Sequence, residues 1–63
     1  PDGIEVTRRV NKNGTFIFIL NHTEEPQVMA IPFAGCDLLG GKSYEEGDAL
    51  TLAAKDVSII KVN

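Results

Sequence analysis

One uninterrupted apolar run at residues 15–20 constrains the fold of this chain more than any other feature. The run is TFIFIL, and its β-branched and aromatic residues favour a β-strand. Because successive side chains of a strand point to opposite faces, this strand would carry apolar groups on both faces. Both faces then need a cover, supplied either by other strands of the chain or by a neighbouring domain.

Short β-type segments follow one another along the rest of the chain. Apolar and polar residues alternate at 4–7 and 49–52, and apolar residues mark further strands at 27–31 and 57–62. Polar or glycine-rich stretches separate these segments, and no window has the apolar spacing of an amphipathic helix. The sequence therefore predicts an all-β fold, a small antiparallel β-sandwich of about six to seven short strands.

Turn residues predict how the first two strands pair. A three-residue loop at 12–14 places Val6 opposite Leu20 and turns the apolar residues of both strands to one face. A two-residue turn at 13–14 would set polar residues against that face, because a slip of one residue turns every side chain over. We therefore expect the three-residue loop.

A second hairpin is predicted next, with residues 23–26 as its connection and Leu20 opposite Met29. The two hairpins agree on one core face, which comprises Ile4, Val6, Val10, Phe16, Phe18, Leu20, Met29, Ile31 and Phe33. The opposite face is also apolar and carries Ile17, Ile19, Val28 and Ala30. Two interpretations of this second face stay open: a further layer of the core, covered by the C-terminal strands, or a domain-docking face.

Groups that could carry catalysis are few. The single histidine, His22, and the single thiol, Cys36, have no partner that the sequence places beside them. The carboxylate pairs at 24–25 and 45–46 fall in polar turns, where nothing would desolvate them. One cysteine permits no internal disulfide, and no Cys/His cluster is present to hold zinc. We expect no catalytic residue, no metal and no cofactor within residues 1–63.

Two features bear on sugars. The Asn-x-Thr triplets at 13–15 and 21–23 match the glycosylation acceptor pattern, but asparagine also caps turns through its side chain. Sugar-binding modules usually present exposed aromatic rings, and the core face takes all three phenylalanines, which leaves only Tyr44 as a free ring. A single tyrosine is a weak stacking platform.

Charge and composition narrow the partners. The net charge is −3 and there is no basic stripe, so neither nucleic acid nor an anionic membrane is an expected partner. The chain has no signal-like apolar segment and opens without methionine, so we expect a piece of a longer cytoplasmic polypeptide.

An ordered set of segments carries a resemblance to a known family. IEVTRR at 4–9 leads into an Asn/Gly turn, and FIFILNHTEEPQ, DLLGG and LTL follow in order. This arrangement resembles the C-terminal domain of family 42 glycoside hydrolases, the bacterial β-galactosidases, over nearly the whole chain.

The resemblance implies that residues 1–63 form a single C-terminal accessory domain, a β-sandwich from a larger glycoside hydrolase. The catalytic glutamates would belong to an upstream barrel, which would be the partner of this domain, and the parent would form homo-oligomers through other domains. The expected function is non-catalytic: the domain packs against the rest of a β-galactosidase-like enzyme and stabilises it. The alternatives are an independent carbohydrate-binding module and a protein-interaction domain that pairs through an exposed edge strand.

Overall fold

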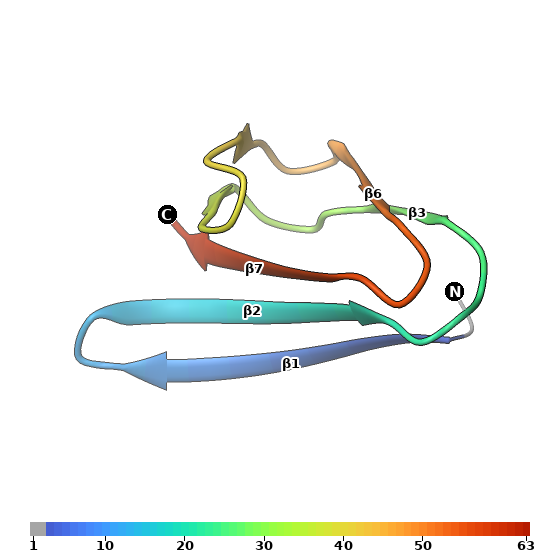
Figure 1. Cartoon of the computed structure of the whole chain (residues 1–63). Helices are drawn as coiled ribbons and strands as arrows, with labels where there is room; N and C mark the ends of the chain where they lie inside the picture. Colours follow the sequence, from blue (N-terminus) through green and yellow to red (C-terminus); the bar gives the residue numbers. More distant parts are fainter. Residues whose placement is uncertain (1–2) are drawn as a thin grey trace.

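The computed structural model describes residues 3–63, and within them it contains seven strands and no helix that could cross a membrane. The strands are β1 (Ile4–Asn11), β2 (Gly14–Asn21), β3 (Gln27–Ala30), β4 (Gly35–Asp37), β5 (Ser43–Tyr44), β6 (Ala49–Leu52) and β7 (Val57–Val62). Five of them form an antiparallel sheet in the order β1-β2-β7-β4-β5, and β3 pairs with β6 in a second sheet (Figure 1). The predicted all-β antiparallel sandwich is confirmed.

The core lies between the two sheets. Ile17 and Ile19 of β2 and Ile60 of β7 pack with Leu50 and Leu52 of β6, and all five side chains are buried. Along β2 every second residue from position 17 is buried, and those between are only half-buried, as the two-residue repeat of a strand requires. The odd-numbered residues of β2 therefore face the core.

The β1–β2 turn is one residue shorter than predicted. Asn11 pairs with Gly14, so two residues lie in the turn, and Val6 stands opposite Ile19. The side-chain oxygen of Asn11 accepts a hydrogen bond from the backbone N–H of Asn13 at 2.8 Å, which supports the tight turn. The predicted three-residue loop is wrong. The difference of one residue changes which side chains of β1 and β2 share a face, so Val6 lies on the face of Ile19 and not on that of Leu20.

The second predicted hairpin is also wrong. β2 pairs with β7, which places Phe18 opposite Ile59, whereas β3 pairs with β6, which places Met29 opposite Leu50. Residues 22–26 therefore form a crossover from one sheet to the other. The apolar residues of β3 would suit pairing with β2 or with β6. Contacts with strands distant in sequence therefore decide the pairing.

The predicted docking face divides between two surfaces. Ile17 and Ile19 lie in the core of the domain, where the smaller sheet covers them. Val28 and Ala30 belong to β3 and are exposed, Val28 by 60%. These four residues do not share a face, so the docking interpretation is corrected and the core interpretation holds for the two isoleucines. Residues 3–63 also leave an apolar surface uncovered on the other side of β2.

Candidate docking face

A concave apolar surface lies on the side of the larger sheet that faces away from the core. Phe16, Phe18 and Leu20 alternate with the core residues of β2 and therefore point outward, and Ile59 of β7 stands opposite Phe18. All four are half-buried. The depression has a volume of about 620 Å³, and we call it the outer groove; it is lined by Thr7, Arg9, Asn11, Phe16, Phe18, Leu20, Leu38 and Ile59.

Basic side chains border the outer groove at one end. The sheet register places Arg9 of β1 opposite Phe16, and Lys61 of β7 opposite Phe16 on its other side. Residues opposite one another share a face, so a cation stands on each side of this ring. The chain as a whole is acidic, with net charge −3. A surface that fits this groove would be apolar and would bring carboxylates to Arg9 and Lys61.

The DLLGG segment supplies the side of the groove beyond β7. The carboxylate of Asp37 accepts the backbone N–H of Leu39 at 2.9 Å, and the Asp37 carbonyl accepts the N–H of Gly41 at 2.8 Å. The N–H of Leu38 donates to the carbonyl of Ile59 at 2.8 Å, which ties the turn to β7. This segment therefore places the exposed Leu38 side chain against the groove.

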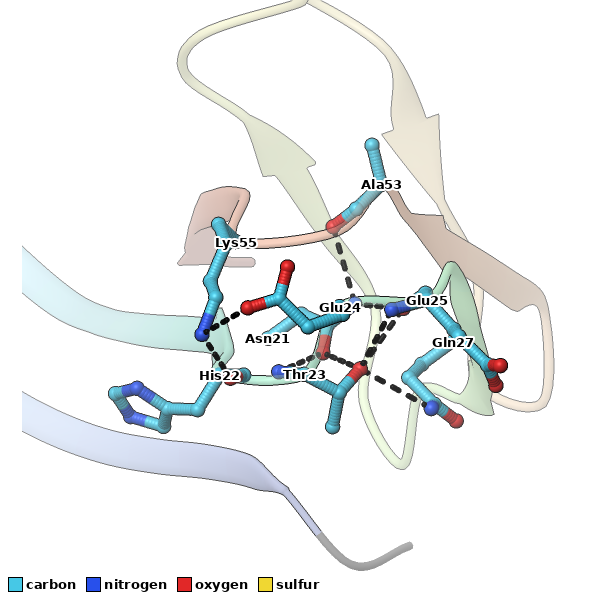
Figure 2. A network of polar contacts seen from close by, with 8 residues as sticks. All are labelled: Asn21, His22, Thr23, Glu24, Glu25, Gln27, Ala53 and Lys55. Carbon is cyan, nitrogen blue, oxygen red and sulfur yellow. Dashed lines mark hydrogen bonds and ion pairs between the residues drawn. The ribbon is translucent and has the colours of Figure 1, made fainter.

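The crossover after β2 is organised by Asn21, whose side chain is only 2% exposed. Its Nδ2 donates to the carbonyls of Glu25 at 2.8 Å and Ala53 at 3.0 Å (Figure 2). Nδ2 also lies 3.3 Å from the carbonyl oxygen of Leu52. Its Oδ1 accepts the N–H of Thr23 at 2.9 Å and the Thr23 hydroxyl at 2.7 Å. Asn21 thus joins the β2–β3 crossover to the segment after β6. Its Asn-x-Thr triplet caps a turn, and its amide is too buried to accept a glycan in the folded chain.

The other polar residues of the crossover also make structural contacts. Lys55 Nζ donates to the His22 carbonyl at 2.7 Å and lies 3.4 Å from a carboxylate oxygen of Glu24 (Figure 2). The His22 ring is 2.8 Å from the Glu5 carboxylate, and both side chains are more than half exposed. Within residues 3–63, no buried side-chain nitrogen or oxygen lacks a hydrogen-bond partner. The buried polar atoms of this corner are therefore all used within the fold.

The remaining candidate residues lie apart from one another. Cys36 is a half-buried free thiol on β4, and β7 lies between β4 and the strand that leads to His22. Tyr44 is buried, with Lys42 Nζ 5.1 Å from its ring centroid, so it is not the free ring that the sequence predicted. Across the described residues, no three His, Cys, Asp or Glu side chains lie close enough together to hold a metal ion.

The outer groove is not predicted from the sequence, because the two predicted hairpins place its aromatic rings in the core. One feature of the sequence could have identified the core face of β2. The odd-numbered positions lead from Ile17 and Ile19 to Asn21, and an asparagine at the end of a strand can be buried when its amide caps the crossover that follows. The even-numbered positions continue to His22, which is exposed.

Known proteins match nearly all of this chain. A family model described as the β-galactosidase C-terminal domain matches residues 3–61. β-Galactosidase LacZ of Heyndrickxia coagulans is 34% identical over 62 residues, which covers 98% of this chain and 9% of that protein. The crystal structure of β-galactosidase from Bacillus circulans sp. alkalophilus has a TM-score of 0.86 and 31% identity, over 100% of this chain and 9% of that chain. The chain belongs to the family of β-galactosidase C-terminal domains, as the resemblance of its sequence to family 42 glycoside hydrolases predicted.

Proposed function

We propose that this chain is a non-catalytic domain of a β-galactosidase-like glycoside hydrolase that packs through the outer groove against the rest of that enzyme and stabilises it. The observation that carries the proposal is the outer side of β2, where Phe16, Phe18 and Leu20 are half-buried and no layer formed by residues 3–63 covers them. Monomeric proteins rarely leave such contiguous apolar surface open. The matched enzymes, of which this chain spans 9%, have ample further chain to provide the missing layer.

Docking would be favourable for two reasons. Removing apolar surface from water contributes about 25 cal/mol per Å², and the half-exposed rings of Phe16 and Phe18 retain much of that surface. Arg9 and Lys61 would add specificity, because a docked surface must offer carboxylates where these cations lose water. The partner that the family resemblance implies is the catalytic barrel of the parent enzyme.

A substitution in the groove tests this function. In the full-length enzyme that carries this domain, Phe18→Ser should lower the midpoint of thermal inactivation by several degrees, because about 1–2 kcal/mol of interface burial is lost. The kcat of the enzyme at low temperature should stay unchanged, since the domain supplies no catalytic group. Val28→Ser is the matched control, because Val28 is also an exposed apolar strand residue but lies outside the groove. Equal effects of the two substitutions would argue against docking through the groove.

Carbohydrate binding is the second candidate function. The outer groove favours it in one respect, because the rings of Phe16 and Phe18 lie beside the polar side chains of Thr7 and Asn11. Titration of the 63-residue chain with galactose and lactose, followed through backbone amide resonances, separates the two. Docking to protein predicts no saturable change at Phe16 and Phe18, whereas a sugar site predicts saturable shifts there.

A further inference from the structure

The first strand leaves one edge of the larger sheet open. β1 pairs with β2 on one side only and ends the sheet order, so within residues 3–63 no strand covers its other side (Figure 1). A strand edge presents a row of backbone donors and acceptors to which another extended chain can bind. This edge is also long, since β1 has eight residues.

The hydrogen-bond pattern identifies which backbone groups are free. In an antiparallel pair, residues that exchange both hydrogen bonds alternate with residues whose N–H and C=O point away. The pair Asn11–Gly14 closes the hairpin, and the Gly3 carbonyl accepts the His22 N–H at 2.8 Å, so odd-numbered residues of β1 bond to β2. The residues that direct their backbone to the open edge are therefore Ile4, Val6, Arg8 and Val10.

Two apolar side chains of this edge are uncovered. Val6 is 54% exposed and Val10 is 63% exposed, and both project on the core side of the sheet, beside Ile19 and Thr15. An added strand would bury these valines while it paired with the free backbone groups. The edge therefore offers apolar contact as well as hydrogen bonds.

The sequence of β1 is complementary to itself. When two copies pair antiparallel with Thr7 opposite Thr7, Glu5 of each copy faces Arg9 of the other, and Ile4 faces Val10. Opposite charges that face one another across strands are favourable, as are threonine pairs. Oε1 of Glu5 is 2.8 Å from the His22 ring, whereas among residues 3–63 Oε2 accepts only a 3.5 Å contact from the Thr7 hydroxyl, and the Glu5 side chain is 56% exposed.

Neighbouring registers are less favourable. The free backbone groups belong to even-numbered residues, so an even-numbered residue of one copy must face an even-numbered residue of the other. From one permitted pairing to the next, the partner of each residue shifts by two positions and the centre of the pairing shifts by one. A pairing centred on Arg8 sets the two Arg8 side chains against each other, which is unfavourable. A pairing centred on Val6 sets Glu5 against Thr7 and leaves Arg9 without a carboxylate. Only the pairing centred on Thr7 matches every charge of Glu5 and Arg9.

We propose that β1 is a self-association edge: two copies of this chain pair antiparallel through β1, centred on Thr7, and join their larger sheets. The contact is symmetric, so the same residues serve both copies and the assembly closes as a dimer. The two outer grooves then lie on the same side of the joined sheet, because both copies continue one surface. Arg9 belongs to both the groove and this edge, and self-association is therefore tested with the 63-residue chain, to which no barrel is docked.

Charge exchange tests the register. Sedimentation equilibrium of the 63-residue chain over roughly a hundredfold range of concentration should show a monomer–dimer equilibrium. Glu5→Arg alone or Arg9→Glu alone should raise the dissociation constant about tenfold or more, because like charges then face each other twice in each dimer. The double variant E5R/R9E should restore dimerisation. Glu46→Arg makes the same charge change in an exposed turn outside β1 and should leave the dissociation constant unchanged.

Hydrogen exchange provides the second readout. In the dimer, amide protection of Val6 and Arg8 should rise with protein concentration, whereas that of Thr7 and Arg9, which bond to β2, should not. Amide spectra of each variant show whether it has folded. The proposal is overturned by a chain that stays monomeric throughout, by a folded double variant that stays dissociated, or by concentration-dependent changes at Phe16 and Phe18 in place of Val6 and Arg8.

Discussion

Asn21→Ala is expected to lower the free energy of unfolding by about 3 kcal/mol, because several buried groups lose their partner at once. The substitution removes the donor to the carbonyls of Glu25 and Ala53 and the acceptor for Thr23. A net hydrogen bond contributes about 0.5–1.5 kcal/mol, and a buried group left without a partner costs more. At about 0.05–0.15 kcal/mol per residue, a domain of this size would lose a large part of its stability.

Urea unfolding followed by circular dichroism measures this effect. The midpoint of Asn21→Ala should fall sharply, with a similar slope if the unfolded states are alike. Asn13→Ala is the matched control, because Asn13 is an exposed asparagine in the β1–β2 turn, and its free energy of unfolding should change by about 0.5 kcal/mol or less. Comparable losses for the two substitutions would contradict the structural role assigned to Asn21.

Ile19→Ala is expected to destabilise the isolated chain by about 3 kcal/mol, since Ile19 is fully buried and its truncation opens a cavity in the core. Phe18→Ala should cost the isolated chain less, about 1 kcal/mol, although a larger side chain is removed, because Phe18 is half-exposed on the outer side. The comparison between these neighbours tests the register of β2 directly. Thermal and urea unfolding of both variants provide the measurement, and the register predicted from the sequence would reverse their order.

The strands could be predicted from sequence because their signals are local. The alternation at 49–52 and the β-branched residues of 57–62 mark β6 and β7 without reference to any other segment. The run at 15–20 likewise marks β2, but it is apolar on both faces, so it carries no polar side that would fix its register. The predicted hairpin registers place the aromatic rings in the core, whereas the structure places the isoleucines of β2 there.

The pairing of the strands could not be predicted because it depends on residues far apart in the chain. Gly35 illustrates this: a Cβ atom there would lie 2.5 Å from the carbonyl oxygen of Lys61, so the close approach of β4 to β7 requires glycine. The sequence shows the glycine but not the strand it approaches. Asn21 is similar, since one of its acceptors, Ala53, is 32 residues away. The outer groove was missed for the same reason, because β6, which covers Ile17 and Ile19 and so leaves the rings on the outer face of β2, is distant in sequence.

The position of β7 has a consequence for how the chain acquires its fold. The last strand in the sequence is the middle strand of the larger sheet, between β2 and β4. During synthesis the β1–β2 hairpin can form early, but β4 can pair only with the two-residue β5 until residues 57–62 have been made. Pairings between distant segments close long loops and slow folding. Folding of the larger sheet therefore has to wait for β7, and a chain that ends before β7 lacks the strand that holds the two halves of this sheet together.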